Sequence, residues 1–92
     1  RGISSITKET MYLAKIYITL KTSVNDPAGQ TIQGSLVDLG FNSVVTVRSG
    51  KYFEVLLNTP DETEARTSVT TMCDKLLSNP VIEDYQFEIE TS

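Results

Sequence analysis

Few side chains in this sequence could do catalytic chemistry. The chain has no histidine and a single cysteine, Cys73. Histidine is the commonest general base and metal ligand, and a cysteine nucleophile needs a neighbouring base or cation to lower its pKa. We therefore expect Cys73 to be a small core residue, and we expect no catalytic residue, no metal site and no cofactor on this chain.

Two groups of acidic residues are the other candidates for binding a cation. Asp61, Glu62 and Glu64 stand at the start of a predicted helix, where carboxylates stabilise the positive end of the helix dipole. The second group lies along the last predicted strand and consists of Glu83, Asp84, Glu88 and Glu90. Charges on an exposed strand discourage pairing with other chains. Ordinary structural roles account for both groups, so neither predicts a metal site.

Two cations flank a glycine in a predicted turn and could bind an anion. Arg48 and Lys51 lie on either side of Gly50, where they could hold a carboxylate or a phosphate. A solvated turn explains them equally well, and both interpretations stay open. The pair Gly34-Ser35 lacks the lysine and the earlier glycine of a phosphate-binding loop, and no G-x-G-x-x-G motif is present.

Composition and charge exclude several classes of partner. The 92 residues carry 8 basic and 12 acidic side chains, a net charge of -4, and 39% of them are hydrophobic. This balance indicates one soluble domain with no basic footprint for nucleic acid or an anionic membrane. One cysteine allows no internal disulfide, which fits a reducing, cytoplasmic location. No apolar run approaches the roughly 18–20 residues that a membrane span needs.

The first half of the chain predicts a strand and a helix. Tyr12–Lys21 alternates apolar and polar residues, which is typical of a strand. Asp26-Pro27 then predicts a helix start, and Gly40 a left-handed helix end. The apolar stripe of this helix is Ala28, Ile32, Leu36 and Leu39. Residues 1–10 lack periodicity and are interpreted as a cloning remnant or a flexible extension before a single domain over residues 11–92.

The second half predicts three strands and another helix. Val44–Arg48 and Tyr52–Leu57 are rich in β-formers, and the Ser49–Lys51 connection between them predicts a hairpin. A helix follows from Thr59 and stops at Asn79-Pro80. Its predicted buried stripe is Ala65, Val69, Met72, Leu76 and Leu77. Val81–Glu90 alternates again and predicts the last strand.

The order strand-helix-strand-strand-helix-strand predicts an α+β fold. With right-handed crossovers it becomes a ferredoxin-like two-layer sandwich, in which two helices lie on one face of a four-stranded antiparallel sheet. The other face then has no helix to cover it. The positions that strand parity assigns to this open face are Leu13, Lys15, Tyr17, Tyr52, Glu54 and Leu56. Tyrosines and leucines with a thin polar ring indicate an interface, although scattered apolar residues also occur on ordinary surfaces.

Two other functions fit the same fold. RNA-recognition modules stack bases on aromatic residues of the third strand, where Tyr52 and Phe53 stand in this chain, but the acidic balance argues against RNA. A stand-alone regulatory module that senses a small molecule is the second alternative.

Several strings of the sequence together resemble one known family. They are AKIYITLK (Ala14–Lys21), DPAG (Asp26–Gly29), QGSLVDLGF (Gln33–Phe41), VRSGKYFEV (Val47–Val55) and CDKLLSNPVIEDYQFEIE (Cys73–Glu90). In this order they resemble the PurS family, the small subunits of phosphoribosylformylglycinamidine synthase. The resemblance extends over Met11–Glu90.

The resemblance implies a role inside a larger enzyme. That enzyme converts formylglycinamide ribonucleotide, glutamine and ATP to formylglycinamidine ribonucleotide in de novo purine synthesis. A glutaminase subunit, PurQ, would release ammonia, and a synthetase subunit, PurL, would bind ATP and magnesium. A member of the small-subunit family would carry no catalytic residue, would form a dimer or tetramer, and would bridge PurL and PurQ and assist ammonia transfer.

The resemblance and the open face together nominate residues for subunit contacts. Matching the family strings are Asp26, Pro27, Gly29, Arg48, Gly50, Lys51, Asn79, Pro80, Glu83, Asp84 and Tyr85. The open face adds Leu13, Tyr17, Tyr52 and Leu56. We assign none of these residues a chemical step.

Overall fold

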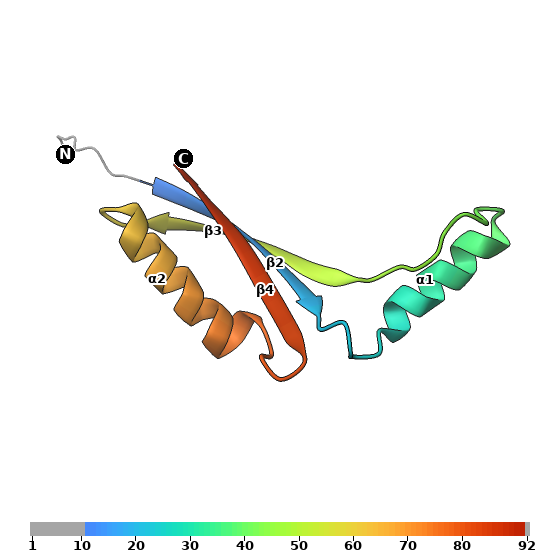
Figure 1. Ribbon diagram of the computed structural model, residues 1–92. Coiled ribbons are helices and arrows are strands. Elements are labelled where there is room, and N and C mark those ends of the chain that lie inside the picture. Colours follow the sequence, from blue (N-terminus) through green and yellow to red (C-terminus); the bar gives the residue numbers. More distant parts are fainter. Residues whose placement is uncertain (1–10, 92) are drawn as a thin grey trace.

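The described part of the chain is built around a three-stranded antiparallel sheet (Figure 1). The computed structural model describes residues 11–91, so the expectation for residues 1–10 lies outside it. The strands are β2 (Met11–Leu20), β3 (Gly50–Asn58) and β4 (Glu83–Thr91), and β2 lies between the other two.

The predicted alternation of the central strand is confirmed. Ala14, Ile16 and Ile18 of β2 are at most 1% exposed and form the centre of the core. In the register, Ile16 lies opposite Phe53 of β3 and Phe87 of β4, so all three strands turn apolar side chains to the same face. The sheet therefore has one apolar face and one open face, as the period of two requires.

One helix covers the apolar face. It is α2 (Glu62–Met72), followed by a π-helical turn, η1 (Cys73–Leu77). The carboxylate of Asp61 caps its start by accepting a hydrogen bond from the Glu64 backbone N–H at 2.8 Å. Val69 and Cys73 are fully buried against the sheet, which confirms Cys73 as a core residue. Leu76, predicted inside, is 82% exposed because the wider π turn rotates it away from the stripe.

The other helix, α1 (Pro27–Asp38), does not lie on the sheet. Figure 1 shows it beyond the end of β2, at the opposite end of the molecule from α2. Its predicted ends are confirmed: Asp26 caps the start, and Gly40 follows the end with a left-handed φ of 103°. We call residues 21–49, which leave the sheet and return to it, the arm.

Two predictions about the arm are therefore wrong for the single chain. Val44–Arg48 is extended but pairs with no strand of residues 11–91, so the described sheet has three strands rather than four. No hairpin forms at Gly50, because the chain runs straight from the arm into β3 (Figure 1). Side chains at the base of the arm bind its two passes to each other, and this arrangement overrides the local turn signal.

The arm gives the protein an extended shape. The principal extents are 59 × 29 × 16 Å, and the radius of gyration is 18.4 Å. A compact domain of this length has a radius of gyration of about 12 Å. A single copy of this chain therefore exposes more of its surface than a compact domain of the same length would.

We predict that the core beneath α2 dominates the stability of the chain. Ile16→Ala should lower the free energy of unfolding by about 2–5 kcal/mol, since it opens a cavity at a site without solvent contact. Leu76→Ala, at an exposed site, should change it by less than about 0.5 kcal/mol. Urea unfolding followed by circular dichroism, at one protein concentration, measures both. Similar losses in the two variants would contradict this assignment of the core.

Candidate functional site

The open face of the sheet carries the residues that strand parity assigned to it. Leu13 of β2 pairs with Leu56 of β3, and Tyr17 pairs with Tyr52. The two tyrosine rings lie 5.1 Å apart and tilted, and these rings and Leu56 are each 41–58% exposed. The strands thus bring the four predicted interface residues Leu13, Tyr17, Tyr52 and Leu56 into one patch.

Charged side chains lie between and beside these four residues. Lys15 lies at the centre of the patch, opposite Glu54 on one side and Glu88 on the other, and its amine pairs with Glu90 at 3.1 Å. The hydrogen bond and charge of Glu90 raise the pKa of Lys15. Tyr52 donates a hydrogen bond to Glu54 at 2.7 Å, which raises the pKa of Tyr52 to about 12.

The carboxylate of Asp26 organises the base of the arm. It accepts hydrogen bonds from the backbone N–H of Gly29 at 2.9 Å, from the Ser49 backbone N–H at 2.7 Å and from the Ser49 hydroxyl at 3.0 Å. The first caps α1, and the other two bind the returning pass of the arm. Asp26 is 2% exposed, and the donors of Ser49 and Gly29 lower its pKa.

Two further contacts close the base of the arm. Arg48 donates to the backbone oxygens of Lys21 at 2.9 Å and Val24 at 3.1 Å. Gly29 comes so close to the Val47 carbonyl oxygen that a Cβ atom would collide with it. Glycine is therefore required at this position for close packing of the two passes.

The two cations considered as an anion site, Arg48 and Lys51, have partners within the chain. The Arg48 guanidinium is directed to backbone carbonyls, and Lys51 pairs with Glu83 at 3.3 Å. Glycine is required at position 50 because a Cβ atom there would lie 2.5 Å from the Ile18 carbonyl oxygen. The structure thus favours a structural role for these three residues.

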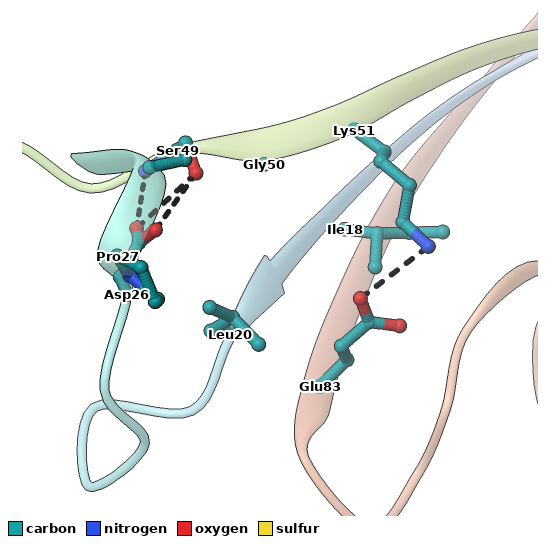
Figure 2. A pocket seen from close by; sticks show the side chains of 9 residues that line it. Ile18, Leu20, Asp26, Pro27, Ser49, Gly50, Lys51 and Glu83 are labelled. Carbon is teal, nitrogen blue, oxygen red and sulfur yellow. Dashed lines mark hydrogen bonds and ion pairs between the residues drawn. The ribbon is translucent and has the colours of Figure 1, made fainter. Parts of the chain in front are cut away.

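A cavity of about 420 Å³ lies where the arm meets the sheet (Figure 2). Apolar side chains of Ile18 and Leu20 line it, together with Pro27 and Ala28 from the start of α1. Figure 2 shows the Lys51–Glu83 ion pair at its margin and the Asp26–Ser49 contacts on another side. The cavity connects the predicted residues Asp26, Pro27, Gly50 and Lys51 with Glu83 of β4.

The remaining predicted residues secure the start of β4. The backbone N–H of Asn79 donates to Glu83 at 2.7 Å, and its side chain accepts from the Val81 N–H at 3.1 Å. Tyr85 lies on the apolar face and donates to Asp74 at 3.1 Å. These contacts join β4 to η1. Subunit contact by Asn79 and Tyr85 stays a prediction.

Several of the exposed large apolar side chains lie in the arm, outside the predicted interface residues. Ile32, Leu39, Phe41 and Val45 of the arm are 45%, 74%, 55% and 85% exposed. The helical stripe through Ile32 and Leu39 is visible in the sequence, where it predicts a face buried on the chain's own sheet. That placement is wrong, since periodicity shows that a face is apolar and does not identify what covers it.

The acidic side chains of the described residues do not come together as a metal site. Over residues 11–91, no group of three or more histidine, cysteine or acidic side chains is placed to hold a metal ion. No helix in this range is long and apolar enough to cross a bilayer.

We predict that Asp26 makes the stability of the arm depend on pH. Its pKa is lower in the folded chain than the usual 3.8, so its stabilising effect is complete above about pH 4 and disappears as the pH falls through the lowered value. Asp26→Asn keeps a capping oxygen but presents an amide to Ser49. The wild type should therefore unfold at higher urea concentration than this variant near neutral pH, and the difference should shrink at acid pH. Asp38→Asn, at an exposed site on α1, serves as control; a pH-independent difference for Asp26→Asn would contradict the assignment.

Comparisons with known proteins agree with the resemblance seen in the sequence. The family model "PurS: Phosphoribosylformylglycinamidine (FGAM) synthase" matches residues 13–91. The chain is 53% identical over 78 residues to the PurS subunit of Synechocystis, covering 85% of this chain and 78% of the relative. It is 45% identical to the Bacillus subtilis PurS subunit, covering 87% and 94%.

Solved structures show the same fold. PurS of Methanocaldococcus jannaschii, described as a subunit of formylglycinamide ribonucleotide amidotransferase in purine biosynthesis, is 41% identical with a TM-score of 0.79, covering 88% of this chain and 98% of that one. A chain in the PurLQS structure of Thermotoga maritima is 28% identical with a TM-score of 0.78, covering 89% and 98%. The chain therefore belongs to the PurS family, the PurS subunits of phosphoribosylformylglycinamidine synthase in purine biosynthesis.

Proposed function

We propose that this chain is a non-catalytic adaptor that bridges the PurL and PurQ subunits and assists ammonia transfer between them. The observation that carries the proposal is the exposed apolar surface of the arm in a PurS-family chain without histidine. The PurLQS structure of Thermotoga maritima contains a relative of this chain, which supports PurL and PurQ as its partners. ATP and magnesium would bind to PurL, and the complex would work in the cytoplasm.

The arm supports a homo-oligomer as the working form of the adaptor. Burying a leucine, isoleucine or phenylalanine side chain is worth about 1.5–3 kcal/mol, and the arm leaves Ile32, Leu39 and Phe41 largely in water. Asp26 and Arg48 join the two passes at its base, and α1 does not lie on its own sheet (Figure 1). The simplest partner that could bury these apolar side chains is a second copy of the chain.

Exchange of arms between two copies would complete the predicted fold. The outer edge of β3 is unpaired in the described sheet, and Val44–Arg48 is an extended segment without a strand partner in residues 11–91. Phe53 and Val55 of β3 are only partly buried on the apolar face, beside the region that α2 covers. The partner's segment would pair with the β3 edge while the partner's α1 covered Phe53 and Val55. Each half of the dimer would then have the four-stranded, ferredoxin-like arrangement.

Reconstitution tests the adaptor role. Purified PurL and PurQ, supplied with formylglycinamide ribonucleotide, ATP, magnesium and glutamine, should form product slowly, and adding this chain should raise the glutamine-dependent rate at least about tenfold. Ammonium chloride in place of glutamine should reduce the dependence, because free ammonia needs no transfer between subunits. An equal glutamine-dependent rate with and without the chain would contradict the proposal.

Light scattering tests the exchange of arms. The wild type should have the mass of a dimer or tetramer, and Leu39→Asp should shift it to a monomer, because a carboxylate would be buried against the partner. Gln30→Glu adds the same charge to an exposed polar position on the opposite side of α1 from Leu39 and should leave the mass unchanged. Circular dichroism checks that α2 and the sheet persist. A wild-type monomer, or a Leu39→Asp variant with wild-type mass, would contradict arm exchange.

A further inference from the structure

The open face is a separate surface from the one that arm exchange would use. Exchange covers the apolar face beside α2, whereas the side chains of the open face point to the other side of the sheet. Across the strands β3, β2 and β4 they form three rows: Leu56, Leu13 and Glu90; Glu54, Lys15 and Glu88; Tyr52, Tyr17 and Gln86. The face therefore has an apolar and aromatic part on β3 and β2 and an acidic part on β4.

The charges of the open face do not balance. In these three rows the carboxylates of Glu54, Glu88 and Glu90 accompany the amine of Lys15. The next row adds Asp84, which pairs with Lys21 at 2.8 Å, so the net charge is about -2. Lys15 is paired with Glu90 at 3.1 Å. Glu54 accepts the hydrogen bond of Tyr52. The carboxylate of Glu88 has no ion pair or hydrogen bond within residues 11–91.

This imbalance decides between the possible occupants. Stacking the open faces of two copies would bring two surfaces of the same sign together and remove their carboxylates from water, which is unfavourable. A surface with lysine or arginine side chains would instead pair with Glu88 and Glu54. A guanidinium group could also lie over the exposed rings of Tyr17 and Tyr52, which adds a cation–π attraction.

We propose that the open face binds a basic surface of one of the two larger enzyme subunits, with arginine or lysine side chains beside apolar ones, and not a second copy of this chain. The proposal rests on the adaptor function above and assigns that function a surface. The Leu13–Leu56 and Tyr17–Tyr52 pairs provide the apolar part of the contact on either side of Lys15 and Glu54, and Glu88 provides a carboxylate beside them on β4. The arm serves self-association, and the open face serves the larger partner.

Charge reversal at one position tests the proposal. Glu88→Lys reverses the unpaired carboxylate, and Glu88→Gln removes its charge without placing a second amine opposite Lys15. Glu64→Lys on the exposed surface of α2 makes the same change of charge away from the face and is the matched control. Binding of each variant to purified PurL and to purified PurQ is measured by calorimetry with ATP, magnesium and glutamine present. Light scattering of each variant alone gives its oligomeric state.

We expect the wild type to bind one of the two subunits, with a Kd that rises as salt is increased from about 50 to about 300 mM. Glu88→Lys should weaken that binding at least about tenfold and Glu88→Gln by a smaller factor, while Glu64→Lys stays within about twofold. The mass of the homo-oligomer should not change. A wild type that binds neither subunit would overturn both this proposal and the adaptor function. Normal binding by Glu88→Lys would overturn this proposal alone, and an altered homo-oligomer mass would show that a second copy occupies the face.

Discussion

The buried carboxylate of Asp26 is the interaction that holds the two passes of the arm together at its base. It caps α1 and also binds the backbone and hydroxyl of Ser49, so one side chain joins the outgoing and returning passes of the arm. Arg48 adds two hydrogen bonds to the same junction. Because these contacts satisfy polar groups that are withdrawn from water, breaking them would leave buried donors and acceptors unpaired. The base of the arm is consequently closed by its own side chains.

The sheet with α2 and the arm differ in how completely they bury their own apolar residues. The sheet and α2 form a closed core around Ile16, Val69 and Cys73. The arm has an amphipathic helix without a core beneath it, and most helical stability in proteins comes from packing of the apolar face. The exposed apolar face of α1 agrees with membership in a family of enzyme subunits.

Local patterns in the sequence predicted the elements well and their placement less well. The alternation of Tyr12–Lys21 correctly placed every β2 side chain on its face, and Asp26 and Gly40 correctly marked the limits of α1. The hairpin was predicted from Ser49-Gly50-Lys51, where the glycine is needed instead for close approach to the Ile18 carbonyl. A turn signal of three residues does not reveal that Ser49 will be bound by Asp26, which lies 23 positions away.

The sequence by itself therefore determined the strand faces, the helix ends, the absence of histidine chemistry and the family, because each depends on residue type or on spacing within a few positions. Tertiary structure alone decided that α1 leaves the sheet, that Val44–Arg48 stays unpaired within residues 11–91 and that Lys15 pairs with Glu90. These features depend on contacts between distant segments, where the hydrogen bonds of one buried carboxylate outweigh the preference of a short turn.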